Sequence, residues 1–228
     1  LEDYKLELQN FCDINAGVLA ENINQFPERE FTLIGIANKA LNLQSRKGNK
    51  YGLLELQDMY GAMEFRLFGE QYLKFSYFLH PGNFLAVTGK VQLKAKHYNS
   101  DGKQKEFKIS KIELLKDVLQ KNVKNIYLRW DSNLMDKKEV DAIEKIFKKH
   151  KGKKPVYFEL IDSTDKSSVL LTSRDVMLNV SNDLYDELNE LSSFLGCSLN
   201  QSKLNEYLRN SSTNSAAQEQ IEEQELIN

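Results

Sequence analysis

The residues with the clearest chemical potential form a short cationic run, Arg46-Lys47-Gly48-Asn49-Lys50, which is followed at once by Tyr51. Gly48 and Asn49 mark a turn, so the three cations are presented on one connection between two predicted strands. Lysine and arginine on a turn suit phosphate contacts, which are strong, sensitive to salt and indifferent to base sequence. A solvated hairpin is the alternative interpretation. We predict that Arg46, Lys47 and Lys50 bind nucleic-acid phosphates.

A second set of cations lies further along the chain, on a predicted strand and the loop after it: Lys90, Lys94, Lys96, Tyr98, Lys103 and Lys105. The members on the strand alternate with apolar residues and therefore share one face. This face and its loop suit a strand of nucleic acid. Lysines also protect exposed strands against aggregation, and this alternative stays open. We place Lys94, Lys96, Tyr98, Lys103 and Lys105 in the candidate site.

Base stacking requires exposed aromatic side chains. The candidates are Tyr51, Tyr60, Tyr98 and Phe68, whereas Phe65 is expected in the core. On the middle strands the outward set is Leu53, Glu55, Glu64 and Arg66, and we add Arg66 to the predicted site. Two glutamates on this face disfavour a polyanion, so we expect weak binding that is led by the loops.

Catalytic patterns are missing from the sequence. No two aspartates stand at positions i and i+2, and no Gly-Lys-Ser/Thr phosphate loop occurs. The three histidines have no evident nucleophile partner, and Cys12 and Cys197 form neither a metal motif nor a disulfide framework. We therefore expect no catalytic residue, no metal site and no cofactor.

The elements that would position these residues follow a recognisable order. Period-2 patterns predict strands over 31–43, 51–58, 62–68, 84–98 and 107–115, and helical spacing covers 70–79 between the third and fourth strands. Gly35 inside the first strand indicates a bulge or a sharp bend. Three strands, a helix and two strands are the OB-fold order, whereas an SH3-like barrel would not carry its helix there.

Charge supports a nucleic-acid partner for this segment. Residues 31–115 hold thirteen basic and seven acidic side chains, a net charge of +6, although the whole chain stands at −2. The apolar runs are too short to span a membrane. The start at Leu1 shows no signal peptide and indicates a piece of a longer protein. We expect a cytoplasmic location.

The predicted organisation is an all-β OB-fold barrel followed by a small α+β domain. The boundaries are an extended lead-in with a short helix (1–30), the OB-fold (31–115), a polar linker (116–124), an α+β docking domain (125–196), and a short helix with an acidic disordered tail (197–228). In the α+β domain Asp136 and Glu139 predict a helix start, and strands are expected at 154–161, 168–172 and 176–180. Ser181 begins a second helix with a stripe of leucines that ends at Leu195.

Two stretches carry a family resemblance. The first runs from Tyr51-Gly-Leu-Leu-Glu-Leu-Gln-Asp58 through Ala-Met-Glu-Phe-Arg-Leu-Phe68 to Gly89-Lys90-Val91, and it resembles the OB domain of the bacterial DNA polymerase III alpha subunit. The second comprises Pro155-Val-Tyr-Phe-Glu-Leu160 and Val-Ser-Asn-Asp-Leu184, and it resembles that subunit's C-terminal domain. Together the resemblance covers about residues 30–195, with details most similar to versions from Bacteroidetes.

This resemblance implies a non-catalytic C-terminal portion of a DNA-directed DNA polymerase. Its OB-fold would bind single-stranded template DNA, and its last domain would contact the clamp-loader tau subunit and other replisome proteins. The catalytic carboxylates would lie upstream of Leu1. The tail ending in Gln224-Glu-Leu-Ile-Asn228 lacks terminal aromatics, and we assign it no clamp-binding role. Two alternatives stay open: the anticodon-binding OB domain of a class II aminoacyl-tRNA synthetase, and an OB module that binds only protein.

Overall fold

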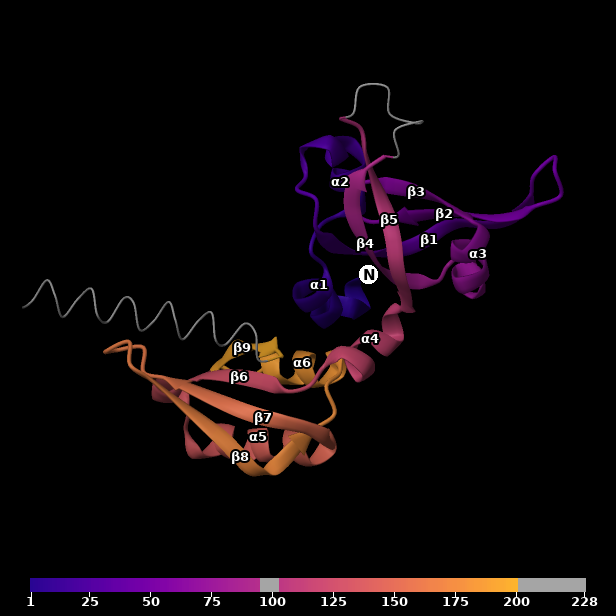
Figure 1. Cartoon of the computed structure of the whole chain (residues 1–228). Coiled ribbons are helices and arrows are strands. Elements are labelled where there is room, and N and C mark those ends of the chain that lie inside the picture. Colours follow the sequence, from indigo (N-terminus) through magenta and orange to yellow (C-terminus); the bar gives the residue numbers. More distant parts are fainter. Residues whose placement is uncertain (95–102, 201–228) are drawn as a thin grey trace, which may run out of the picture. The chain divides into compact units, whose positions relative to one another are not determined.

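The computed structural model describes residues 1–94 and 103–200, and the chain divides into two compact units, Leu1–Lys121 and Asn122–Asn228 (Figure 1). We describe each unit by itself. Within the described residues, no helix has the length and apolar character needed to cross a membrane.

The first unit is built on five strands, namely β1 (Glu30–Gln44), β2 (Lys50–Gln57), β3 (Ala62–Phe68), β4 (Phe84–Leu93) and β5 (Lys105–Leu114). Their order in the sheet is β3-β2-β1-β4-β5, with antiparallel neighbours throughout. Helix α3 (Gly69–Phe75) and the 3-10 turn η3 (Ser76–Phe78) lie between β3 and β4 in the chain. This connectivity confirms the predicted OB-fold.

Strand β1 pairs with two neighbouring strands. Its first half pairs with β4 over Glu30–Ile36, and its second half pairs with β2 over Ile36–Gln44. The register shifts between Ala37 and Lys39, just after the predicted bend at Gly35. A side chain at Gly35 would place its Cβ only 2.5 Å from the carbonyl oxygen of Gln57. The bend of the barrel therefore requires a glycine at this position.

The inward faces of the strands form the core. Phe65 is 5% exposed, as expected, and it packs 5.9 Å from Phe107 of β5 between ring centroids. Phe75 of α3 and Leu79, which follows η3, also belong to this core. The apolar residue Leu93, at the end of β4, is 44% exposed and lies outside this core.

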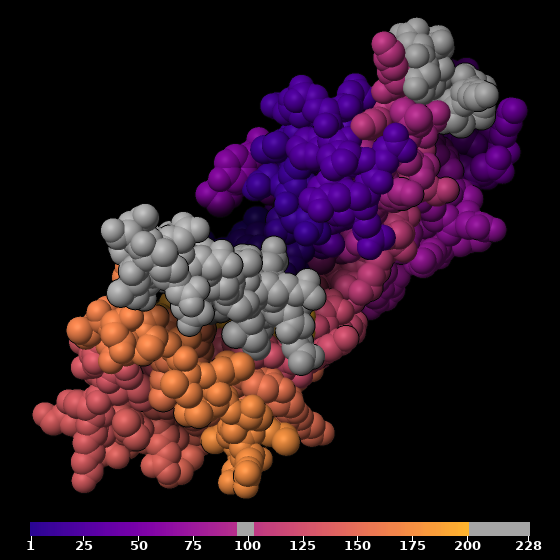
Figure 2. Space-filling view, turned by 60° about the vertical axis from the view of Figure 1, so that its left-hand side comes forward, coloured from indigo at the N-terminus to yellow at the C-terminus, as the bar shows by residue number. Residues whose placement is uncertain are grey.

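Residues 1–30, predicted as an extended lead-in with a short helix, contain more helix than expected. They form η1 (Glu2–Tyr4), α1 (Lys5–Phe11), α2 (Ala16–Asn22) and η2 (Ile23–Gln25). Ala16 and Leu19 are fully buried in the barrel core, and the backbone N–H of Ala16 donates to the Asp58 carboxylate at 2.5 Å. In Figure 2 these residues form the indigo surface of the first unit. Apolar contacts that are distant in sequence thus make this segment part of the OB unit.

The predicted polar linker is also different. Most of it belongs to helix α4 (Leu115–Asn122), whose Leu115, Val118 and Leu119 are buried. These three residues have the i, i+3, i+4 spacing of a helix face, a signal that the surrounding lysines obscured.

The second unit has a four-stranded sheet in the order β8-β7-β6-β9. Its elements are β6 (Ile126–Asp131), η5 (Ser132–Leu134), α5 (Lys137–Lys149), β7 (Lys151–Ile161), β8 (Ser168–Leu178), α6 (Asn182–Asn189) and β9 (Phe194–Leu199). Strands β6 and β7 are parallel, and the other pairs are antiparallel. The α+β prediction is confirmed.

Several details of this unit depart from the sequence prediction. The two strands expected at 168–172 and 176–180 are one continuous strand, β8. Helix α6 ends at Asn189 rather than Leu195, and Cys197 lies in β9 rather than in a short helix. The leucine stripe misled the prediction because Leu191 and Leu195 belong to the turn and the strand that follow the helix. The predicted disordered tail from residue 201 lies outside the described residues.

Candidate nucleic-acid interface

The β1–β2 hairpin presents the first predicted cations on an ordered turn. The Gly48 N–H donates to the Ser45 carbonyl at 2.9 Å, and the Gln44 side-chain amide donates to the Gly48 carbonyl at 2.9 Å. Gly48 has φ +81°, a conformation that favours glycine. Arg46, Lys47 and Lys50 are all exposed. Their backbone is therefore fixed while their charged ends reach into solvent.

An apolar row begins beside this turn and crosses three strands. Leu43 lies opposite Tyr51, and Tyr51 lies opposite Phe68. The Tyr51 and Phe68 rings are stacked, with centroids 5.3 Å apart and planes inclined by 24°. Phe68 is 58% exposed. Exposed aromatic faces of this kind suit stacking with bases.

These residues line a shallow hollow of about 470 Å³ on the outer face of β2 and β3. Its walls come from Leu43, Ser45, Tyr51, Leu53, Glu64, Arg66 and Phe68. The lining is mainly apolar, and Ser45, Glu64 and Arg66 contribute polar groups to it. This combination can hold a flat ring and still contact its polar edge.

Arg66 reaches this hollow, but its charge is partly neutralised. Its Nε donates to the Glu64 carboxylate at 3.0 Å. The other acid of the face, Glu55, accepts from the Asn38 amide at 2.7 Å and lies directly opposite Glu64. The two carboxylates give one end of the face a negative potential, while the hairpin end is positive.

A second hollow, of about 450 Å³, lies between β3 and β5, the two ends of the sheet order. Arg66 and Glu64 line both hollows. Lys94 and Glu106 also line the second hollow.

The predicted cations on β4, β5 and the loop between them differ in their exposure and in their hydrogen-bond partners, unlike the three exposed cations of the hairpin. Lys103 is exposed, and Lys94 lies within 3.5 Å of the Gln104 side chain. Lys105 donates from Nζ to the Phe26 carbonyl at 2.6 Å, so its side chain anchors the N-terminal segment instead of reaching into solvent. Lys96 and Tyr98 lie outside the described residues.

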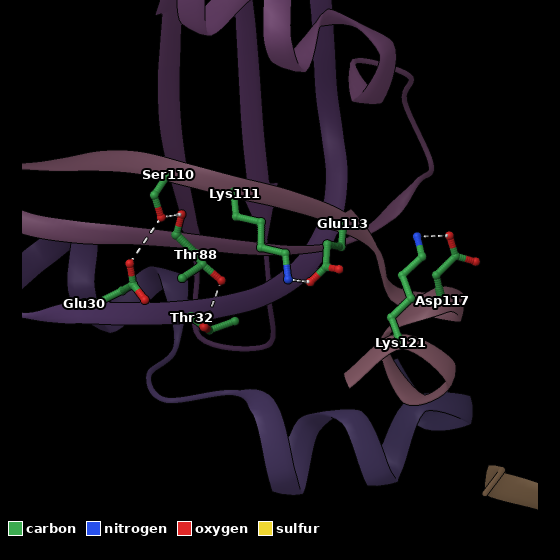
Figure 3. Close-up of polar contacts among 8 residues, drawn as sticks. All are labelled: Glu30, Thr32, Thr88, Ser110, Lys111, Glu113, Asp117 and Lys121. Carbon is green, nitrogen blue, oxygen red and sulfur yellow. Dashed lines mark hydrogen bonds and ion pairs between the residues drawn. The ribbon is translucent and has the colours of Figure 1, made fainter. Parts of the chain in front are cut away.

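Several polar side chains on the outer surface of β1, β4 and β5 pair with one another. Ser110 donates to Glu30 at 3.3 Å, and Thr32 and Thr88 share a hydrogen bond of 3.0 Å (Figure 3). Lys111 pairs with Glu113 at 2.6 Å. Among residues 1–94 and 103–200, in contrast, no ion pair involves Arg46, Lys47 or Lys50. The hairpin therefore presents three exposed cations that are open to a polyanion.

The described thiols have no feature of a reactive site. Burial raises the pKa of the Cys197 thiol to about 12, and burial also raises the pKa of Cys12. Both groups stay protonated at neutral pH, which makes them poor nucleophiles. In the described part of the chain, no cluster of three or more His, Cys, Asp or Glu side chains could hold a metal ion.

Of the residues that line the first hollow, Tyr51 and Arg66 belong to the site predicted from the sequence. Phe68 was considered for stacking without being placed in that site, and Leu43 was not considered. The signal lies in the register: Phe68 ends a strand with its neighbours Phe65 and Leu67 buried, so it must point to the outer face beside Tyr51.

Two families of known proteins match this chain, one in each of its two units. Residues 36–115 match the family described as OB-fold nucleic acid binding domain. Residues 126–195 match the family described as DNA polymerase III alpha subunit, C-terminal domain. The chain resembles the C-terminal region of the DNA polymerase III alpha subunit.

A curated relative agrees with this resemblance. The DNA polymerase III subunit alpha of Bacillus subtilis (strain 168) is 26% identical over 130 residues, which are 57% of this chain and 11% of that protein. The chain therefore spans only a small part of the curated relative's length.

Solved structures that are similar to part of this chain include the second single-stranded DNA-binding protein (SSBb) of Mycobacterium smegmatis. It is 14% identical, with a TM-score of 0.25, over 39% of this chain and 89% of that one. The second OB-fold domain of replication protein A from Methanococcus maripaludis is 20% identical, with a TM-score of 0.27, over 44% of this chain and 94% of that one. The fold assignment rests on the strand order itself.

Proposed function

We propose that the first unit binds single-stranded DNA across the outer face of β2 and β3. The observation that carries this proposal is the stacked, exposed pair of Tyr51 and Phe68 beside the open cations of the β1–β2 hairpin. Stacked bases would meet the aromatic faces while the phosphates meet Arg46, Lys47 and Lys50. The carboxylates of Glu55 and Glu64 oppose a polyanion, so the affinity is micromolar or weaker.

The proposed ligand is DNA, which the chain would bind as part of a replicative polymerase. The family match of residues 126–195 supports this assignment, because that domain belongs to a DNA polymerase subunit. The chain acts without nucleotide addition and contributes template binding to a longer polypeptide that carries the catalytic carboxylates. Primer extension by the pure chain with magnesium and nucleotides would contradict the non-catalytic part of this proposal.

The experiment is a fluorescence anisotropy titration with labelled single-stranded DNA and with RNA of the same sequence. Measurements at about 50 mM and about 200 mM salt distinguish binding through phosphate contacts from other modes of binding, because phosphate binding weakens steeply across this range. We expect saturable DNA binding that is lost at the higher salt. Preference for RNA would favour an anticodon-binding role, and absence of binding at both salt concentrations would favour a protein-only module.

The second unit is proposed to dock a replisome protein, with the clamp-loader tau subunit as the first candidate. Its helices are securely capped, since Asp136 accepts from the Glu139 N–H at 2.8 Å and Ser181 accepts from the Leu184 N–H at 3.2 Å. A pull-down of tau by the full chain tests this assignment. If the binding persists without residues 116–228, the second unit is not the docking surface.

A further inference from the structure

The first hollow, on the outer face of β2 and β3, has an aromatic end and a charged end. The strand register places Tyr51 opposite Phe68 at the end nearest the hairpin, and it places Leu53 opposite Arg66 in the next row. Glu64 follows one row further along β3 and shares the outer face with Arg66 and Phe68. All five residues line the hollow. A base in the hollow therefore meets aromatic rings at one end and an ion pair at the other.

The ion pair at the charged end keeps most of its hydrogen-bonding capacity. Arg66 Nε donates to Glu64 Oε1 at 3.0 Å, and among the described residues neither side chain makes another hydrogen bond. A guanidinium has several further N–H donors, and a carboxylate has several further acceptor positions. The Arg66 and Glu64 side chains are 66% and 43% exposed, and so exposed an ion pair contributes little to stability. A ligand can therefore bind both groups at little cost to the fold.

Charge determines which part of a nucleotide can face Glu64. Its carboxylate and that of Glu55, which lies directly opposite, repel phosphate. The cations of the β1–β2 hairpin attract phosphate from the other end of the hollow. A strand that binds through these cations therefore directs its phosphates toward the hairpin and its bases toward the ion pair. The group that can face Glu64 is an uncharged N–H donor, and the edges of bases carry such donors.

Guanine is the base whose edge matches this pair of side chains. Its Watson–Crick edge carries two adjacent donors, N1–H and N2–H, beside the acceptor O6. A carboxylate can accept from both donors while a neighbouring guanidinium donates to O6. On the same edge, adenine, cytosine and thymine each present a single donor next to an acceptor. Guanine alone among the four DNA bases can therefore give a carboxylate two parallel hydrogen bonds.

We propose that this hollow is a guanine-selective subsite, an inference that rests on the proposed single-strand binding by the first unit. The base packs against Tyr51 and Phe68, the Glu64 carboxylate accepts from N1–H and N2–H, and Arg66 donates to O6. A bidentate contact discriminates between bases by roughly fivefold to more than a hundredfold. Because Glu64 and Arg66 are exposed, we expect a preference at the lower end, about fivefold.

Anisotropy titrations of the full chain at about 50 mM salt test the inference with oligothymidylates that carry one central test base. We expect guanine at the centre to bind about fivefold more tightly than thymine, adenine or cytosine. Hypoxanthine, which lacks the N2 amine, should lose most of this preference. Equal affinity for all five strands overturns the inference and leaves single-strand binding intact. Absence of binding to every strand overturns the proposed function together with the inference.

A matched pair of variants separates base recognition from the effect of charge. Glu64→Gln should abolish the preference for guanine and bind the all-thymine strand more tightly, because one negative charge that faces the phosphates is removed. Glu55→Gln removes the same charge from the opposite position on β2, and Glu55 is not among the described residues that line the hollow. This control should also bind the all-thymine strand more tightly but keep the preference.

Neither carboxylate belongs to the buried core, so both variants should fold. A guanine preference that persists in Glu64→Gln, or that both variants lose equally, overturns the inference.

Discussion

Tyr51 of β2 and Phe68 of β3 lie directly opposite each other, with ring centroids 5.3 Å apart. Such an aromatic pair contributes about 0.5–1.5 kcal/mol beyond the burial of its surface. Phe68 still exposes more than half of its surface. The pair joins two strands and also presents a flat apolar surface beside the cationic hairpin.

Replacing Phe68 by alanine should weaken single-stranded DNA binding. Loss of one stacking contact costs about 1–3 kcal/mol, or roughly fivefold to more than a hundredfold in Kd. Anisotropy titration at low salt measures the change. The matched control is Tyr77→Ala, because Tyr77 is 74% exposed on η3 and outside both hollows. Equal losses from both variants would show that the Tyr51–Phe68 surface is not the stacking site.

The triple variant Arg46→Ala/Lys47→Ala/Lys50→Ala should weaken binding and reduce its dependence on salt. Each lost phosphate contact removes roughly 0.7 from the log–log salt slope, so the total change is about two units. The fold should persist, because exposed turn substitutions usually lie within about 0.5 kcal/mol of neutral. The same change at Lys137, Lys138 and Lys145 of α5 is the control. If the two triple variants lose affinity equally, binding depends on the overall charge of the chain and not on the hairpin.

Replacing Glu139 should remove part of the acid sensitivity of the second unit. Partial burial raises the pKa of the Glu139 carboxyl, but hydrogen bonds from Ser192 and Ser193 outweigh this effect and hold it below the ordinary value of 4.5. A lowered folded pKa stabilises the native state above the unfolded value. This stability is lost as the pH falls from about 4.5 through the folded pKa.

Urea unfolding of Glu139→Gln between neutral pH and pH values below that range measures this contribution. We expect the variant to be less stable at neutral pH and to lose less stability on acidification than the natural chain. Glu144→Gln, on the same helix, serves as the control. An identical acid slope in the natural chain and in Glu139→Gln would contradict the assignment.

Gly35→Ala should destabilise the first unit. The added methyl group would meet the Gln57 carbonyl oxygen at 2.5 Å, so β1 and β2 must separate where β1 changes partners. Overpacking of this kind costs about 1–3 kcal/mol. Urea unfolding measures the loss. Lys39→Ala, an exposed change on the same strand, should stay within about 0.5 kcal/mol of the natural chain.

Local periodicity was sufficient to predict the five strands and the helix of the OB unit. Met63, Phe65 and Leu67 alternate with outward residues, and glycines stand at the hairpin and at the bend of β1. The helix cap at Asp136 could also be predicted from local sequence. Its side chain accepts a hydrogen bond from the free backbone N–H of Glu139, only three residues later. Signals of this kind depend on neighbours in sequence, and the order of the elements then determined the barrel.

The tertiary structure decided the features that depend on distant partners. Ala16 and Leu19 enter the barrel core because Asp58 anchors α2, and Lys105 is directed to the Phe26 carbonyl across 79 residues of sequence. The stacking of Tyr51 on Phe68 required the register of β2 and β3. Residue type and spacing determined which side chains could bind a nucleic acid. Only packing determined which of them remain open to do so, because burial and pairing are set by contacts between segments far apart in the chain.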